Sequence, residues 1–477
     1  MYPLTKKVYA YTFLLFGFNL FLKGLFYTKV SFSGDEPFTF YHALLPVKDI
    51  VSILLQGNNP PAYEIFMHYW MRVFGTEVWA LRLPSLLAAS AVPALWFALI
   101  SRFYKQSIAF FVALMFTFLQ EQWIFSQEMR AYALCFFMLS LALFLLSFIQ
   151  EKKGFYFIFS AALLTALAVY THYLSVLTLP LFYWVILKKQ VKPLHSILVF
   201  SFLLAVLLLP FGWILLQRLS DPDNTLWGSP PDWKQLYGQW NTAFNFRFWI
   251  ILLLLAIGLL LPESRVKLKQ LRFTPESWRW TGFLGVVLLF LYLSVFVFSL
   301  YKPMFQSRYL SFLFFGFVPV FGILLSSVLN ETARGKYLMI AILIALLSGL
   351  KFNAKPDDHP ERVASLTSEF QQEHRSAVVL LFPEWYGLTL AYHSNLKEVP
   401  LQEINSALKA QNIFTFWDEE RIDFLIRELE PSSLLYIDAG EYFLYGEYRF
   451  EDRIASYFPN KKVLQVDRQV RLIYFAE

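Results

Sequence analysis

Apolar runs separated by short polar links dominate the chain up to about residue 350. A helix that crosses the ~30 Å hydrocarbon core of a bilayer needs ~20 mostly apolar residues. Runs of roughly this length lie at about residues 8–27, 78–101, 107–124, 131–149, 155–171, 172–187, 194–216, 246–262, 279–301, 309–329 and 337–350. The stretch from Phe155 to Leu187 is too long for one helix, so we expect a break near Tyr170-Thr171-His172. The pattern predicts an all-α polytopic membrane protein with about 11 transmembrane helices.

The stretch between the first two runs, at about 28–77, carries two shorter segments with helical patterning. EPFTFYHALLP has Pro37 in a first helical turn and ends at Pro46, and PPAYEIFMHYWMRVFG ends at Gly75. Apolar residues of the second segment recur at helical spacing, namely Ile65, Phe66, Tyr69, Trp70 and Val73. Both segments are too short or too polar to span a bilayer, so we expect amphipathic helices on the outer membrane surface.

Residues 351–477 have a different pattern. SAVVLLF and SSLLYIDAG are typical of short buried strands, and EERIDFLIRELE predicts an amphipathic helix with Phe424, Leu425 and Leu429 on one face. A segment of ~127 residues can bury a core of its own. We therefore expect two domains, a transmembrane domain over 1–350 and a small extracytoplasmic α/β domain over 351–477.

The composition supports a membrane protein. Of the 477 residues 57% are hydrophobic and only 16% are charged, against about 25% in ordinary globular domains. The mean hydropathy is +0.47. The single cysteine, Cys135, excludes an internal disulfide. The first apolar run lacks a small-residue cleavage site, which favours a retained anchor over a cleaved signal peptide.

The net charge of +6 would fit nucleic-acid binding, but the placement of the basic residues argues against it. Lysine and arginine cluster at every second link between apolar runs, which is the positive-inside pattern of a multi-span protein. The clusters are Lys6-Lys7, Arg102 with Lys105, Lys152-Lys153, Lys188-Lys189 with Lys192, Arg265 to Arg272, and Arg334 with Lys336. We expect a multi-pass protein of the inner (plasma) membrane, with a cytoplasmic N-terminus, an extracytoplasmic C-terminal domain and no nucleic-acid partner.

Two adjacent carboxylates, Asp35 and Glu36, follow the first apolar run. Adjacent residues of a helix do not share a face, so one can point into a cavity while the other turns away. A carboxylate placed there could act as a general base. The alternative is that one of the two simply caps the helix that begins near Pro37.

The segment QEQWIFSQEMRAY forms a second polar cluster. The preceding run is apolar only from Ile108 to Leu119, which at ~1.5 Å per residue is too short to cross the bilayer core. Either Gln120 and Glu121 dip into the membrane, or a water-filled outer cavity reaches down to them, and Glu128 and Arg130 follow. Ionisable residues at such a depth usually line a site or pathway. The alternative is an ion pair of Arg130 with Glu128 or Glu121 that fixes helix packing.

Arg308, in YKPMFQSRYL, is the third feature of the outer ends of the helices. Its planar guanidinium suits phosphate binding, although arginine and tyrosine also serve as interfacial anchors. His42, His68 and His172, with Glu64, would be metal-binding residue types, but their spacing matches no ligand signature. No metal and no other cofactor is expected.

Several of these stretches, in this order, resemble motifs of the GT-C superfamily of polytopic glycosyltransferases, in particular its bacterial members related to protein O-mannosyltransferases and to the aminoarabinose transferase of lipid A. They are GDEPFTFYHA, NNPPAYEIFMHYWMRVFG followed by VWALRLPSLLAA, SQEMRAYAL and YTHYLS. The likeness covers residues 8–190 and fades through 190–350, where QSRYL and the topology match. Two positions depart from the family pattern, because Glu64 replaces a tyrosine and Asn59 a histidine.

The resemblance implies a transferase that moves one sugar from a polyprenyl-phosphate carrier to a glycan, lipid or protein acceptor. Asp35 falls at the position of the proposed catalytic base, and Glu36 is its acidic neighbour. We expect the donor and its phosphate to be bound by Arg130, Arg308, Tyr63, Glu128 and His172. A phosphate leaving group needs positive charge rather than a protonated acid, and one-step displacement would invert the anomeric carbon.

Two other classes of function stay open at this stage. A transporter or flippase of lipid-linked sugars usually has polar or helix-breaking sites near the bilayer midplane. Here the midspan regions are apolar apart from Asn19 and Lys23, and the polar clusters sit at the outer edge, which favours an enzyme. A non-catalytic envelope assembly protein would instead use the loop at about 217–245 and the C-terminal domain. Among enzymes, a polymerase or ligase of lipid-linked oligosaccharides is a further alternative.

Overall fold

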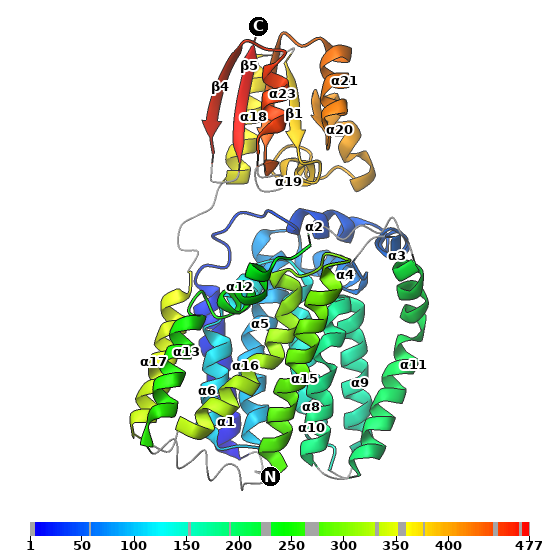
Figure 1. The fold of residues 1–477 in the computed structure, drawn as a ribbon. Coiled ribbons are helices and arrows are strands. Elements are labelled where there is room, and N and C mark those ends of the chain that lie inside the picture. Colours follow the sequence, from blue (N-terminus) through cyan, green and yellow to red (C-terminus); the bar gives the residue numbers. More distant parts are fainter. Residues whose placement is uncertain are drawn as a thin grey trace. The chain divides into compact units, whose positions relative to one another are not determined.

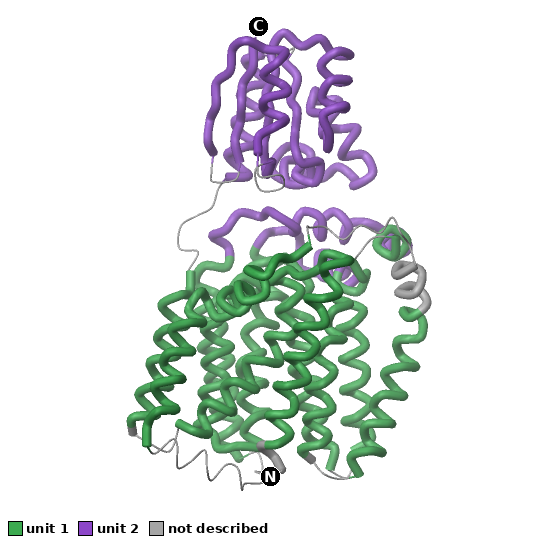
Figure 2. The backbone as a smooth tube through the Cα atoms, viewed as in Figure 1, with its two compact units in different colours: residues 1–27, 51–63, 79–352 green, residues 28–50, 64–78, 353–477 purple. Residues whose placement is uncertain are grey.

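The computed structural model of the chain describes residues 5–56, 59–150, 154–189, 192–220, 230–262, 276–329, 333–351, 359–374, 377–441, 447–466 and 470–476. The chain divides into two compact units, shown in green and purple in Figure 2. The helical unit comprises residues 1–27, 51–63 and 79–352, and the sheet-containing unit comprises residues 28–50, 64–78 and 353–477. The loop that bears Asp35 and Glu36 thus belongs to the same unit as the C-terminal region.

The helical unit is a bundle of mostly apolar helices (Figure 1). Its elements are α1 (Lys6–Gly24), α5 (Val78–Ser101), α6 (Gln106–Thr117), α7 (Gln120–Ser126), α8 (Ala131–Leu146), α9 (Gly154–Thr171), η1 (Tyr173–Thr178), α10 (Leu179–Lys189), α11 (Pro193–Ser220), α12 (Trp233–Ala243), α13 (Phe248–Leu260), α15 (Glu276–Ser299), α16 (Ser307–Leu329) and α17 (Ala333–Gly349). Every predicted apolar run contains a helix. The predicted break at 170–172 is confirmed, because α9 ends at Thr171.

The predicted span over 107–124 is broken in the structure. The chain breaks between Thr117 and Gln120, and α6 and α7 meet at a bend of 61°. A second bent pair, α12 and α13, meets at 75°. Among the described residues five helices are long and apolar enough to cross a membrane, or up to seven if each bent pair is one span. The basic link from Arg265 to Arg272 lies outside the described residues.

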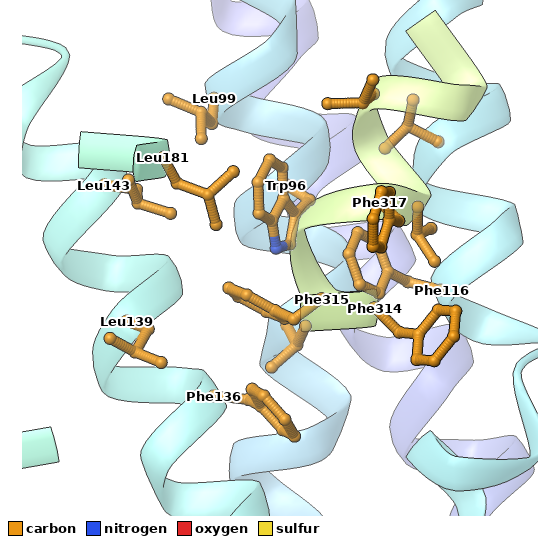
Figure 3. Packing of buried hydrophobic residues seen from close by; sticks show 14 of the residues in the cluster. Trp96, Leu99, Phe116, Phe136, Leu139, Leu143, Leu181, Phe314, Phe315 and Phe317 are labelled. Atoms are coloured by element: carbon orange, nitrogen blue, oxygen red, sulfur yellow. The ribbon is translucent and has the colours of Figure 1, made fainter. Parts of the chain in front are cut away.

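Helix α16 forms the centre of the bundle. Of its most apolar stretch 89% is buried, against 22% for α11, whose apolar side chains are therefore left to face lipid. Aromatic rings fill the space around α16 (Figure 3). The indole of Trp96 lies 5.4 Å from the ring of Phe116 and 5.3 Å from that of Phe315, and Phe136 lies 4.9 Å from Phe315. These contacts join α5, α6, α8 and α16.

Glycines on α16 allow neighbouring helices to approach closely. A Cβ at Gly316 would come within 2.9 Å of Leu288 Cδ1 on α15, and one at Gly322 within 2.9 Å of Val112 Cγ2 on α6. Because lipid tails are as apolar as leucine, helices in a membrane associate mainly through close van der Waals contact of this kind. The small residues of α16 thus let the bundle close around it.

The sheet-containing unit combines helices of the first loop with a C-terminal α/β fold (Figure 1). Its first-loop helices are α2 (Glu36–Leu44) and most of α4 (Ala62–Phe74). Helix α3 (Val47–Gln56) is divided between the two units after residue 50. Its C-terminal elements are α18 (His359–Glu373), β1 (Val378–Phe382), α19 (Tyr386–Tyr392), η2 (Leu401–Glu403), α20 (Ile404–Ala410), β2 (Ile413–Thr415), α21 (Glu419–Leu429), β3 (Ser433–Asp438), α23 (Arg449–Ala455), β4 (Asn460–Gln465) and β5 (Arg471–Ala476). The two predicted helices of the first loop correspond to α2 and α4.

The C-terminal sheet has the strand order β2-β1-β3-β5-β4. Strands β1, β2 and β3 are parallel, and β5 is antiparallel to both β3 and β4. The predicted strands around β1 and β3 are buried at every position. The predicted apolar face of α21 was partly wrong, because Phe424 is 51% exposed while Ile422, Leu425 and Ile426 are buried. The fold class, a polytopic helical protein with a small α/β region, is confirmed.

A buried lysine compensates for a proline in α5. Pro93 has no N–H to donate to the carbonyl of Ala89, four residues earlier. Lys23 Nζ of α1 donates to that carbonyl over 2.8 Å, and the Lys23 side chain is fully buried. One turn away, Asn19 Nδ2 donates to Thr117 Oγ1 at the end of α6 over 3.2 Å. Lys23, which the sequence showed only as a polar residue in an apolar run, therefore has a structural role.

We expect Lys23→Met to lower the thermal stability of the detergent-solubilised protein, because it leaves the Ala89 carbonyl unpaired. An unsatisfied buried backbone group costs about 1–3 kcal/mol. The loss should shrink in a Pro93→Ala background, where position 93 regains its N–H. Lys6→Met, which alters an exposed lysine of the same helix, is the control. An equal loss of melting temperature in both backgrounds would contradict this interpretation.

Candidate functional site

Three predicted site residues from distant parts of the sequence converge in the helical unit. Arg130 lies at the N-cap of α8, His172 lies between α9 and η1, and Arg308 lies in the first turn of α16. Arg130 and Arg308 are both near enough to His172 for their charges to act on its imidazole. We call these three residues the basic cluster. It places two guanidinium groups around one ring at an end of the bundle.

Aromatic rings enclose His172. The ring centroids of Phe312, Tyr132 and Tyr309 lie 4.7, 5.0 and 6.0 Å from that of His172. Nδ1 of His172 accepts a hydrogen bond from the N–H of Leu174 over 3.3 Å, so the proton of the neutral ring is on Nε2. The ring is therefore fixed in both position and tautomer, with an N–H donor available on its far side.

The broken helix α6–α7 leads the chain into this cluster, and the side chain of Asn245 holds the break. Asn245 Nδ2 donates to the carbonyls of Phe118 over 2.6 Å and Leu346 over 2.8 Å, and Oδ1 accepts from the N–H of Gln120 over 2.7 Å. Asn245 has a φ of 57°, in the left-handed region that asparagine tolerates better than most residues. One amide thus forms hydrogen bonds with backbone groups at the ends of three helices, α6, α7 and α17.

Gln120 extends this network to the end of α17. Its amide donates to the carbonyl of Lys351 over 3.2 Å and accepts from the N–H of the same residue over 2.6 Å. Gly349 is required beside this contact, because a Cβ there would lie 2.3 Å from the carbonyl oxygen of Asn245. The sequence analysis did not find Asn245. A lone asparagine at the start of an apolar run was the signal available.

The other acidic and aromatic candidate residues of this unit lie on α4, on α7 and in the bend before α8. Glu121 lies in the first turn of α7 and is partly exposed, and Glu128 is partly exposed in the bend before Arg130. The main-chain N–H of Arg130 donates to the carbonyl of Glu128 over 2.8 Å. Tyr63, in the first turn of α4, is only 1% exposed. Their binding roles remain predictions.

In the sheet-containing unit the two carboxylates of the first loop have different surroundings. Asp35 is exposed at the N-cap position of α2 but makes no side-chain capping hydrogen bond. Glu36 is 3% exposed, and its Oε2 accepts from the N–H of Ser33 over 3.4 Å. Gly34, with a φ of +62°, supplies the left-handed turn just before them. The capping alternative for Asp35 therefore finds no support in its side-chain hydrogen bonds.

Helix α4 supports α2 from one side. His68 Nδ1 lies 2.8 Å from the carbonyl of Ala43, and the hydroxyl of Thr39 donates to Glu64 Oε1 over 3.5 Å. Glu64, one of the two departures from the family pattern, is 4% exposed and faces α2 through this contact. Within the described residues no three histidine, cysteine, aspartate or glutamate side chains are arranged to hold a metal ion.

Part of the chain matches a protein-family model. Residues 58–214 match the model described as dolichyl-phosphate-mannose-protein mannosyltransferase. This region includes Tyr63, Glu128, Arg130 and His172. No curated protein sequence is significantly similar to the chain.

The fold is similar to that of solved membrane proteins. The apo-state crystal structure of ArnT from Cupriavidus metallidurans matches with a TM-score of 0.53 and 12% sequence identity, over 98% of both chains. The oligosaccharyltransferase of Archaeoglobus fulgidus matches with a TM-score of 0.46 and 10% identity, over 89% of this chain and 69% of that one. The match to ArnT shows that the chain has an ArnT-like fold, as the resemblance implied, and its apolar helices make it a multi-pass membrane protein.

We expect Asn245→Ala to lower the thermal stability markedly, because one buried and two partly buried backbone groups lose their partner, and a buried group costs about 1–3 kcal/mol. Asn245→Gly also removes the side-chain amide, but glycine adopts the left-handed φ of this position without strain. Comparing the two variants separates the effect of the amide from that of backbone strain. Asn241→Ala, on the preceding helix turn, is the matched control and should change the melting temperature little. Similar effects at 241 and 245 would refute the role assigned to Asn245.

Proposed function

We propose that the protein is a glycosyltransferase that moves a single sugar from a polyprenyl-phosphate carrier to an acceptor on the extracytoplasmic side of the membrane. The observation that carries this proposal is the basic cluster of Arg130, His172 and Arg308. A reaction whose leaving group is the phosphate of a lipid carrier needs positive charge beside that phosphate. The match of residues 58–214 to a mannosyltransferase family model supports the same class of reaction.

The basic cluster would stabilise the leaving group. As the bond between the anomeric carbon and the phosphate oxygen breaks, negative charge grows on the polyprenyl phosphate. Charged donors that are already in position at such a group lower the barrier without reorganising. Arg130 and Arg308 would supply the charge and the Nε2–H of His172 a further hydrogen bond, while Tyr63 and Glu128 would complete the donor site.

Asp35 would be the general base. It would take the proton of the acceptor hydroxyl while the acceptor oxygen attacks the anomeric carbon, so the products are the glycosylated acceptor and polyprenyl phosphate. An exposed carboxylate at the start of a helix is a group that can accept this proton. Glu36 would fix the turn that presents Asp35, through its contact with Ser33. A single displacement inverts the anomeric centre.

The proposed cellular arrangement follows from the distribution of basic residues. The N-terminus would be cytoplasmic, the protein would reside in the inner membrane, and the C-terminal region would be extracytoplasmic. The acceptor would be a glycan, a lipid or a protein that meets the carrier at the outer surface.

The test is consumption of radiolabelled polyprenyl-phosphate sugars by the purified protein in nanodiscs, with a membrane extract as acceptor. The donor panel would contain hexose, pentose and amino-sugar carriers. We expect wild type to consume one donor and Asp35→Asn to lose about 10²–10⁴-fold in rate, the usual contribution of a general base. Glu77→Gln, which neutralises an exposed carboxylate of the same unit, is the control.

Each outcome of this test separates the candidate functions. Consumption of no donor would refute the proposal and favour a transporter or an assembly protein. Equal rates for wild type and Asp35→Asn would retain the transferase but remove Asp35 as its base. A product that keeps the anomeric configuration of the donor would contradict the single displacement.

Loss of a guanidinium from the basic cluster should weaken binding of the phosphate product. A hydrogen bond to a charged group contributes about 1.5–3 kcal/mol, which corresponds to roughly 10–100-fold in affinity. We therefore expect Arg308→Gln to raise the inhibition constant of polyprenyl phosphate by about that factor. Lys302→Gln makes the same charge change in the link before α16 and should have little effect. Equal changes in both variants would indicate only a general electrostatic attraction.

A further inference from the structure

The C-terminal region is joined directly to the segment that leads into Asp35. His393, at the end of α19, lies with Nε2 2.6 Å from the carbonyl oxygen of Phe32, three residues before Asp35. Its side chain is only 7% exposed. On its other edge, Nδ1 lies 3.4 Å from Glu361 Oε1 of α18. A residue 361 positions away in the sequence thus holds the main chain of the first loop.

Together, His393 and Glu361 contact two successive residues of the first loop. Glu361 uses its second oxygen, Oε2, to accept a short hydrogen bond from the hydroxyl of Ser31. A carbonyl oxygen only accepts, so Nε2 of His393 must donate to Phe32. Nδ1 donates to Glu361 only when both ring nitrogens carry a proton, and in that form the contacts Ser31–Glu361–His393–Phe32 fix one side chain and one main-chain group of the same short segment. These contacts restrain both the path and the rotation of the segment.

Aromatic contacts reinforce these hydrogen bonds. The ring of Tyr392 stacks on that of Phe32 at 4.3 Å and meets Phe40 of α2 edge-on at 5.0 Å. Lys397 Nζ lies 4.6 Å from the centre of the Tyr392 ring. Stacking of buried rings typically contributes beyond the area that it buries, so these contacts add to the hydrogen bond at the Phe32 carbonyl.

The far end of α2 is also held by the C-terminal region. Tyr41 is fully buried, and its hydroxyl donates to the carbonyl of Leu396 over a long 3.5 Å. Burial, with the nearby Tyr392 adding to it, raises the pKa of Tyr41, so this hydroxyl stays protonated and able to donate. Helix α2 is therefore attached to the C-terminal region on both sides of the Asp35–Glu36 pair.

We propose that His393 and Glu361 are positioning residues that set the orientation of Asp35, so that the C-terminal region acts as a support for the catalytic loop. This inference rests on the proposed function, in which Asp35 is the general base. Ser33 and Gly34 lie between the held segment and Asp35, and the left-handed φ of Gly34 leaves one defined turn there. A base that is misplaced by about 1 Å can lose roughly 10²-fold in rate.

The kinetic test compares variants of the full-length protein in nanodiscs. His393→Leu removes the donor to Phe32, whereas His393→Gln retains an N–H at a similar reach and should rescue. We expect His393→Leu and Glu361→Gln to lower kcat by about 10–100-fold with the donor KM changed less than about twofold, because the basic cluster is untouched. His374→Gln, which alters a histidine of the same region stacked on Tyr474, is the control.

A double-mutant comparison distinguishes positioning from loss of folding. In an Asp35→Asn background His393→Leu should have no further effect on kcat, because the residue acts through Asp35. Additive losses, or a KM that rises together with the fall in kcat, would overturn the proposal. A His393→Gln variant as slow as His393→Leu would do the same.

Hydrogen exchange tests the support without relying on activity. Peptides that cover residues 31–45 should exchange faster in His393→Leu and Glu361→Gln than in wild type or His374→Gln. Unchanged exchange would overturn the proposal even if wild type consumes a sugar donor. If the two variants exchange faster but the wild type consumes no sugar donor, the support of the loop by the C-terminal region would stand. The proposed glycosyltransferase function would then be refuted.

Discussion

The bilayer offers no water to backbone polar groups, and this constraint accounts for the main irregular features of the helical unit. A proline inside a span frees a carbonyl, and a broken span frees several N–H and carbonyl groups. At the proline, Lys23 donates to the Ala89 carbonyl. At the broken span, Asn245 bonds to the carbonyl of Phe118 and the N–H of Gln120. These buried polar side chains pair backbone groups that a proline and a helix break would otherwise leave without a partner.

The same constraint explains why the candidate site is built at helix ends. Arg130 begins α8, His172 separates α9 from η1, and Arg308 begins α16. Charged groups are costly in the apolar interior but acceptable where a helix ends near water. The bundle fixes these ends because α16 is surrounded by other helices and because aromatic rings and glycines leave little freedom at its surface. The precision of the site therefore comes from packing deep in the membrane.

The helices, the break at Thr171 and strands β1 and β3 could be predicted from the sequence, since each follows directly from hydrophobic pattern. The break after Thr117 could not, because Phe118 and Leu119 are apolar and its stabilising partner lies more than a hundred residues away. Phe424 was misplaced because several helical faces of α21 carry apolar residues, and only the tertiary fold selects Ile422 and Leu425. The convergence of Arg130 with Arg308 likewise depends on which helices become neighbours.

The two compact units carry the two chemically different parts of the proposed reaction. The leaving phosphate is attached to a polyprenyl chain that is soluble only in the bilayer, and its proposed binding groups belong to the helical unit. The acceptor hydroxyl must give up a proton, and the base proposed to take it is an exposed carboxylate of the other unit. Ser31 and Phe32, which precede this carboxylate, are held by hydrogen bonds and ring stacking to Glu361, Tyr392 and His393, the kind of contact that organises loops of soluble enzymes. Helix packing thus fixes the groups proposed to bind the donor, while contacts typical of a soluble fold fix the segment before the proposed base.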